Sequence, residues 1–177
     1  CKQWSKAEGY HYSVYSTPAE SLTDRFNRMD REKFGRIEGV TDHDFYTNSF
    51  HYPVWLQPTP MEKLSYEKDF PYYASGGFIN YCAEYPCLQD NPKALEAVWD
   101  YAYNIGIGYL GTNTPIDHCF VCGFQGDFEP TEEGFKCPEC GNSNPDKCNV
   151  TKRTCGYLGS PVQRPMVHSR HEEIAHR

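Results

Sequence analysis

The sequence predicts a mixed α/β fold followed by a small cysteine-rich segment and a glycine-containing loop. Strand-like and helix-like patterns alternate up to about residue 115. Paired cysteines are concentrated in residues 117–148, and glycines and prolines recur in residues 149–167. We therefore expect three parts, which comprise residues 1–116, 117–148 and 149–177. The first part has too few strands to close a barrel alone.

The bulk composition is that of a folded protein rather than a disordered tail. Hydrophobic residues make up 38% and aromatic residues 15% of the 177 positions. We find no run of about 18 apolar residues that could span a membrane, and no secretory signal. The formal net charge is -7, without a basic stripe. This charge disfavours the binding of duplex DNA or RNA.

The cysteines and the first residue bear on the origin of the chain. Nine cysteines are an odd number, which disfavours a complete disulfide framework, and we expect a reducing, cytoplasmic compartment. The chain begins with Cys1 instead of Met, as in a processed product, a fragment or one piece of a split protein. Protein splicing leaves a cysteine at the start of a downstream segment, and an arbitrary boundary is the alternative origin.

A short strand and a helix are the first predicted elements. Apolar and polar residues alternate over residues 10–14, which is the pattern of a strand. A helix is expected over residues 19–33, because Thr17 and Glu20 form a capping-box pattern and Gly35 is a suitable stop. The expected apolar face of this helix comprises Leu22, Phe26 and Met29.

A loop-rich stretch then leads to a strand–helix–strand unit. Residues 36–75 are interrupted by Pro53, Pro58, Pro60 and Pro71. A strand over residues 76–82 is followed by a helix that starts at residues 91–93. The residues of this helix at core spacing are Leu95, Val98, Trp99 and Ala102. We expect Tyr72 and Tyr73, like the helix that carries Trp99, to lie in the core.

Two CxxC pairs predict a metal site. Cys119 and Cys122 form the first pair, Cys137 and Cys140 form the second, and fourteen residues separate the pairs. Each pair is followed by a glycine, which permits the backbone to turn under the sulfurs. Four thiolates suit a closed, tetrahedral and structural zinc site, and iron is the alternative metal. Two disulfides are the alternative without a metal, and His118 is expected to be a solvated neighbour of the site rather than a fifth ligand.

The stretch KRTCGYLG at residues 152–159 resembles the C-terminal RxCGY signature of glycyl-radical enzymes, and of anaerobic ribonucleotide reductases in particular. Segments that also resemble this reductase family are residues 15–20, 39–51 and 111–117. The order of metal knuckles, glycine loop and terminus is similar too. The resemblance therefore extends over nearly the whole chain.

This resemblance implies a fold, an activity and partners. The fold would be the C-terminal portion of a ten-stranded α/β barrel of glycyl-radical type, followed by a zinc-ribbon-like segment and a radical loop. The complete enzyme, expected to be a homodimer, would reduce ribonucleoside triphosphates to deoxyribonucleotides. Gly156 would store the radical after an activating enzyme that uses S-adenosylmethionine and an iron–sulfur cluster removes its Cα hydrogen. The thiyl-forming cysteine would lie upstream, in the N-terminal part of the same reductase.

Other assignments remain open for the residues near these motifs. Gly156 could be a plain turn glycine, and Cys155 and Cys148 are expected to be packing residues. Ser16 and Thr17 precede an expected helix, whose N-terminus attracts anions. The family resemblance implies that this segment faces the nucleotide, so both residues are candidate contacts for the substrate phosphates. The alternative is an ordinary cap without a ligand, and Asn113 and Thr114 are weaker candidates for the same cavity.

Three functional hypotheses follow. The first is a reductase fragment that is active only with its N-terminal remainder. The second is a spare radical domain that restores an oxygen-damaged enzyme, although a spare part would need little of residues 1–116. The third is a zinc-ribbon interaction module without catalysis, which accounts for residues 117–148 alone.

Overall fold

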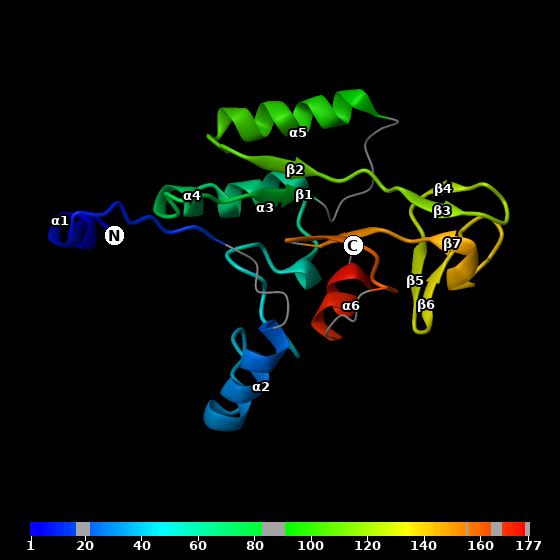
Figure 1. The fold of residues 1–177 in the computed structure, drawn as a ribbon, viewed down its shortest axis with the longest axis horizontal. Coiled ribbons are helices and arrows are strands. Elements are labelled where there is room, and N and C mark those ends of the chain that lie inside the picture. The colour runs from blue at the N-terminus through cyan, green and yellow to red at the C-terminus, as the bar shows by residue number, and fades with distance from the viewer. Residues whose placement is uncertain (17–21, 83–90, 155, 164–167, 176–177) are drawn as a thin grey trace.

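The regular elements of the first part of the chain are mainly helices, and those of the second part are mainly short strands (Figure 1). The computed structural model describes residues 1–16, 22–82, 91–154, 156–163 and 168–175. Figure 1 shows α1 (Lys2–Glu8) at one end of the longest axis and the cysteine-rich segment at the other. No described helix has the length and apolar character required to cross a membrane.

The remaining elements are short. The other helices are α2 (Thr23–Phe34), α3 (Pro60–Glu67), α4 (Phe70–Tyr73), α5 (Pro92–Asn104) and α6 (His168–Ala175), with 3₁₀ turns η1 (Val54–Leu56) and η2 (Pro145–Lys147). The strands are β1 (Asn80–Cys82), β2 (Leu110–Thr112), β3 (Asp117–Cys119), β4 (Gln125–Gly126), β5 (Glu129–Thr131), β6 (Gly134–Lys136), β7 (Cys148–Asn149), β8 (Lys152–Thr154) and β9 (Tyr157–Gly159).

The predicted strand–helix–strand unit is confirmed. Strand β1 pairs in parallel with β2, and α5 lies between them in the chain. Asn91 caps α5, because its side-chain oxygen accepts a hydrogen bond from the Ala94 N–H at 3.2 Å. Helix α3 packs against α5 and β1. The core between these elements is formed by Leu64, Cys82, Val98 and Ala102.

The proline-rich stretch contains more helix than the sequence analysis predicted. Pro60 is the first residue of α3 rather than an interruption, because proline at this position lacks only an N–H that would be unpaired anyway. Thr59 and Glu62 form a complete capping box: the Thr59 N–H donates to Glu62 Oε2 at 2.8 Å, and the Glu62 N–H donates to Thr59 Oγ1 at 3.3 Å.

The N-terminal predictions are wrong in part. Residues 2–8 form a helix that the pattern did not indicate, and the strand expected at residues 10–14 does not form; the next residue, Tyr15, makes an isolated bridge with Gly77. Helix α2 begins at Thr23 with Leu22 as its cap, and it ends before Gly35 as predicted. Thr17 and Glu20, which carry the predicted capping box, lie outside the described residues.

Several side chains that were expected to be buried are exposed. On α2, Phe26 is 47% and Met29 is 49% exposed, and Trp99 on α5 is 52% exposed. Tyr72 and Tyr73 are 84% and 75% exposed. The periodic pattern indicates which face is apolar, but it does not say which chain segment covers that face. Apolar surface of this extent is typical of an interface.

The second part of the chain consists of small antiparallel sheets. Strands β4, β3 and β7 form one sheet in that order, and β5 with β6 and β8 with β9 form two hairpins. Residues 149–167, which were predicted to be a loop, therefore contain the β8–β9 hairpin. The short C-terminal helix α6 packs against β8, β5 and α2.

Candidate metal centre and glycine hairpin

Two equivalent turns hold the paired cysteines. In the first knuckle (residues 119–123), the Gly123 N–H donates to the Cys119 carbonyl at 2.9 Å. In the second knuckle (residues 137–141), the Gly141 N–H donates to the Cys137 carbonyl, also at 2.9 Å. Gly123 and Gly141 have φ angles of 80° and 71°, which residues with a Cβ rarely adopt. This repetition confirms the role predicted for the glycine after each pair.

The four sulfurs converge on one point. The ligand atoms of Cys119, Cys122, Cys137 and Cys140 all lie within 4.8 Å of one another. Two distances link the knuckles: Cys119 Sγ lies 3.6 Å from Cys140 Sγ, and Cys122 Sγ lies 3.7 Å from Cys137 Sγ. Tetrahedral zinc with Zn–S bonds of about 2.3 Å requires sulfurs about 3.8 Å apart. The cluster can hold a metal, and none of the four cysteines is in a disulfide.

Burial and hydrogen bonding differentiate the four thiols. Cys119 and Cys137 are fully buried, whereas Cys122 and Cys140 are exposed. Burial raises the pKa of Cys119, but hydrogen bonds from the backbone of Cys122 and Val121 and from the Asn142 amide lower it to about 6. The hydrogen bond from the Phe124 backbone lowers the pKa of Cys122, but burial and the neighbouring sulfurs outweigh it and raise this pKa to about 12. Four adjacent thiolates therefore require a compensating cation.

The two buried cysteines of the cluster are part of a small apolar core. It consists of Cys119, Phe128, Phe135, Cys137, Val150 and Ile174. His118 is half-buried, its ring lies against that of Phe120, and it is not a member of the four-ligand cluster. Cys148 was expected to be buried but is only half-buried, and its thiol donates to the Asn144 carbonyl at 3.2 Å.

Gly156 lies at the turn of the β8–β9 hairpin, which we term the glycine hairpin. Thr154 and Tyr157 are paired across the two strands on either side of the turn. Gly156 is half-buried and has a φ angle of 92°, a backbone conformation that favours glycine. Its neighbour Cys155 lies outside the described residues.

The two faces of β8 contact different parts of the molecule. Lys152 and Thr154 are both buried, and Arg153 between them points the other way, as alternation along a strand requires. The Lys152 ammonium donates to Asp117 Oδ2 at 2.6 Å, next to the first knuckle. The Arg153 guanidinium lies 4.7 Å from the centre of the Tyr81 ring on β1. The glycine hairpin therefore bridges the cysteine-rich segment and the first part.

A second buried polar cluster surrounds Glu67 and was not predicted from the sequence. His51 Nδ1 lies 3.3 Å from Glu67 Oε1, the Asn80 amide donates to Glu67 Oε2 at 3.0 Å, and Lys63 forms a close ion pair with the same carboxylate. Burial raises the pKa of Glu67, but His51 and Lys63 outweigh it and hold the pKa at about 2. Helical spacing of Lys63 and Glu67 was the only available signal.

The candidate phosphate contact is described only in part. Ser16 donates its N–H to the Gly77 carbonyl at 2.9 Å, and its hydroxyl contacts that of Ser49, 33 residues later. Ser49 has a φ angle of 56°, which is uncommon outside glycine and recurs at functional sites. Thr17 lies outside the described residues, and Asn113 and Thr114 follow β2. Two segments that carried the family resemblance, residues 15–20 and 39–51, therefore meet at Ser16 and Ser49.

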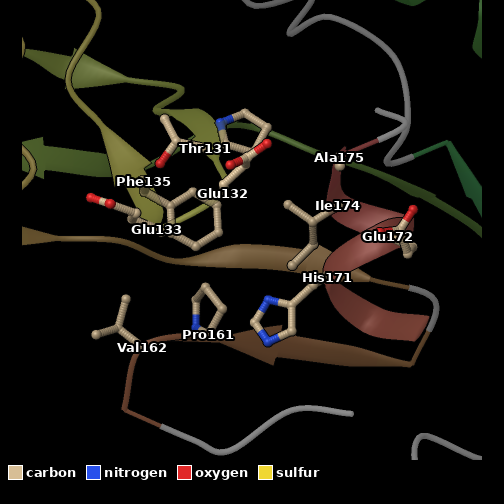
Figure 2. A pocket seen from close by; sticks show the side chains of 12 residues that line it. Thr131, Glu132, Glu133, Phe135, Pro161, Val162, His171, Glu172, Ile174 and Ala175 are labelled. Carbon is tan, nitrogen blue, oxygen red and sulfur yellow. The ribbon is translucent and has the colours of Figure 1, made fainter. Parts of the chain in front are cut away.

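A pocket of about 760 Å³ opens between the β5–β6 hairpin and α6. Figure 2 shows His171 and Ile174 of α6 facing Phe135 of β6 and Pro161 across it. Glu132 and Glu133 of the hairpin lie on its rim. No sequence motif indicated this pocket, because its walls come from segments far apart in the chain.

Comparison with known proteins relates the whole chain to one group of enzymes. The family model described as anaerobic ribonucleoside-triphosphate reductase matches residues 1–177. The enzyme of that name from Haemophilus influenzae is 55% identical over 176 residues, which cover 99% of this chain and 25% of the relative. The enzyme from Escherichia coli (strain K12) is 52% identical, and the match covers 99% of this chain and 24% of that relative. The enzyme from Enterobacteria phage T4 is 48% identical, and the match covers 99% of this chain and 29% of that relative.

A solved structure of an anaerobic ribonucleotide reductase has a similar fold. It superposes with a TM-score of 0.64 at 22% identity, and the match covers 99% of this chain and 26% of that chain. At this identity the likeness concerns the fold alone. The chain thus spans about a quarter of the length of the relatives it matches. Because the family model covers every residue, the chain belongs to the family of anaerobic ribonucleoside-triphosphate reductases.

Proposed function

We propose that this chain is the C-terminal part of an anaerobic ribonucleoside-triphosphate reductase and that Gly156 stores its radical. One observation carries the proposal: in a chain that matches the family over residues 1–177, the glycine of the RTCGY motif lies at the turn of a tethered hairpin. The complete enzyme would reduce ribonucleoside triphosphates to deoxyribonucleotides. The parallel β1–β2 pair would be part of its ten-stranded barrel.

Glycine is the residue whose chemistry suits radical storage. When the Cα hydrogen leaves with its electron, the unpaired electron is shared between the adjacent amide nitrogen and carbonyl. Sharing is greatest when Cα is planar, and glycine has no Cβ that resists flattening. An activating enzyme with an iron–sulfur cluster and S-adenosylmethionine would take the hydrogen atom from Gly156. The stored radical would then oxidise a cysteine thiol elsewhere in the reductase, and the thiyl radical would attack the substrate ribose.

We infer that the four-cysteine cluster holds structural zinc. The S–S distances of 3.6 Å and 3.7 Å support a tetrahedral ion, and Asn142 supplies the outer hydrogen bond that such sites use. Four sulfurs leave no position open for substrate, so the ion would hold the two knuckles together. Iron is the alternative, because the same thiolates bind it.

Ser16 and Thr17 are proposed to contact the substrate phosphates. The position of Ser16 beside Ser49, whose backbone has a positive φ, supports this role. The observed start of α2 at Thr23 weakens the helix-dipole argument, because the first turn of α2 begins six residues after Thr17. The contact would therefore come from the hydroxyl groups of Ser16 and Thr17.

The proposed partners are the N-terminal remainder, the activating enzyme, the nucleotide substrate and a second copy of the complete enzyme. The exposed aromatic side chains of Trp99, Tyr72 and Tyr73 support burial against a remainder that makes up about three quarters of the relatives. We propose a cytoplasmic location, which the free cysteines support. A zinc module without catalysis would account for the cluster but not for a family match over the full chain.

The test is anaerobic activation of the complete reductase, followed by exposure to air. We expect a glycine-type doublet in the EPR spectrum and oxygen-dependent cleavage of the chain at Gly156, measured by mass spectrometry. A folded, metal-loaded enzyme that gives neither result with an activating enzyme of proven activity would contradict the proposal.

A further inference from the structure

A buried ion pair joins the cysteine-rich segment to the glycine hairpin. Asp117 is fully buried on β3, two residues before Cys119, and Lys152 is 8% exposed on β8. Their side chains lie 2.6 Å apart although Lys152 follows Asp117 by 35 positions in the chain. Each side chain therefore fixes a different element.

Both partners have further bonds that hold them in place. Asp117 accepts the Phe128 N–H at 2.8 Å and the Thr151 N–H at 2.7 Å. Lys152 donates to the Phe128 carbonyl at 2.9 Å and also contacts the Asp127 carboxylate. The charges are thus paired and hydrogen-bonded on both sides, which is the condition under which a buried pair is retained.

Besides the buried ion pair, the glycine hairpin is held by helix α6, which packs against β8, and by a contact on its opposite face. Its sheet contains only β8 and β9 among the described residues. On the opposite face of β8, Arg153 contacts the Tyr81 ring. Strand β8 therefore lies between this contact and the Asp117–Lys152 ion pair. Gly156 follows Lys152 by four residues, so we expect a shift of Lys152 to move the turn at the end of β8.

We propose that Lys152 is a positioning residue for Gly156, which transmits the position of the first metal knuckle to the glycine hairpin through Asp117. This inference rests on the proposed function, because it concerns the transfer of a hydrogen atom from Gly156. Hydrogen transfer depends steeply on the distance between the reacting atoms, and a misplacement of about 1 Å costs up to about a hundredfold in rate. Lys152 touches neither the substrate nor the reacting atoms in this role.

The test compares Lys152→Met with Lys136→Met in the complete reductase. Lys136 is the matched control, because its ion pair with Glu129 is solvent-exposed. Three quantities are measured: metal per chain, glycyl radical per chain by EPR at a fixed activation time while the wild-type signal is still increasing, and hydrogen exchange of the backbone amides. We expect Lys152→Met to retain its metal, to exchange faster in residues 152–159 than wild type, and to form roughly tenfold to a hundredfold less radical.

Two further variants keep the test decisive. Lys152→Arg retains the charge and should restore most of the radical, and Asp127→Asn should behave as wild type because Asp127 is largely exposed. If Lys152→Met loses its metal, the test uses Asp117→Asn in its place. An asparagine oxygen still accepts the Thr151 N–H in this variant. We then expect an intermediate radical content at full metal occupancy.

The outcomes separate the two proposals. Absence of a radical in the wild-type enzyme contradicts the proposed function itself. The positioning role is overturned if metal-loaded Lys152→Met has the wild-type radical content and unchanged hydrogen exchange in the glycine hairpin. The same result in Asp117→Asn overturns it where that variant replaces Lys152→Met. The proposed function stands in both cases. A loss of radical that occurs equally in Lys136→Met also overturns it, because the effect would not depend on the buried pair.

Discussion

The Asn142 amide nitrogen lies 3.4 Å from the Cys119 sulfur, so the residue that follows the second knuckle contributes a hydrogen bond to a cysteine of the first knuckle. The same amide donates to the Lys147 carbonyl at 3.1 Å, which fixes its orientation. A donor to a thiolate lowers its charge density and stabilises the ionised form. Burial raises the pKa of Cys119, but the hydrogen bonds from the Cys122 and Val121 backbone and from Asn142 outweigh it. The lowered pKa of Cys119 therefore agrees with this arrangement.

Removal of this amide should weaken metal binding without abolishing it. We expect Asn142→Ala to reduce metal affinity by roughly tenfold to a hundredfold, because outer hydrogen bonds orient the ligands. Competition with a chromogenic chelator measures the change. Asn149→Ala on β7, where the side chain is exposed, is the matched control and should keep wild-type affinity. Equal affinity of the two variants would remove Asn142 from the site.

Loss of a buried sulfur should have a larger effect than loss of a sulfur outside the cluster. Cys119→Ser removes a ligand from the core of the site, and we expect metal per chain to fall by on the order of tenfold. Cys148→Ser should retain its metal, because Cys148 is not a member of the cluster. Elemental analysis by mass spectrometry distinguishes the variants. Parallel metal loss in both would show that the site is not limited to the four proposed ligands.

Glu67 should make stability depend on pH in the acidic range. Its pKa is about 2 in the folded protein against an ordinary 4.5, so the folded state favours the carboxylate. The stabilisation is present above pH 4.5 and is lost as pH falls towards 2, because the unfolded chain binds the proton first. The difference corresponds to about 3 kcal/mol.

Urea unfolding between pH 6 and pH 3 tests this linkage. We expect wild type to lose stability faster than Glu67→Gln as the pH falls, with a difference on the order of 1–3 kcal/mol. Glu96→Gln on α5, where the side chain is exposed, should follow wild type. Identical pH profiles for wild type and Glu67→Gln would mean that His51 and Lys63 do not hold the carboxylate in its charged form.

Local signals explain which parts of the fold could be predicted. Asn91 followed by proline predicted the start of α5 correctly, because capping is decided within one turn. The CxxC spacing likewise predicted a cluster that depends on two tight turns. By contrast, Pro60 was interpreted as a break although it begins α3, since the same residue stops one helix and starts another.

Long-range contacts explain what could not be predicted. No local pattern in the sequence relates Asp117 to Lys152, and only the folded structure shows that they form a buried pair. The exposure of Trp99 has a related cause. The periodic pattern predicts which face of the helix is apolar, but whether that face is buried depends on another chain segment that packs against it. Thr17 and Cys155 lie outside the described residues, so their predicted roles stay predictions.

The most direct test of the central claim is the EPR spectrum of the activated complete reductase prepared with glycine deuterated at Cα. The account predicts a doublet in the unlabelled enzyme, its collapse in the deuterated enzyme, and no signal in Gly156→Ala. Gly108→Ala is the control, because a Cβ at Gly108 meets no atom within 4 Å, and it should retain the doublet. A doublet that persists in Gly156→Ala, or one that does not change on deuteration, would contradict storage of the radical at Gly156.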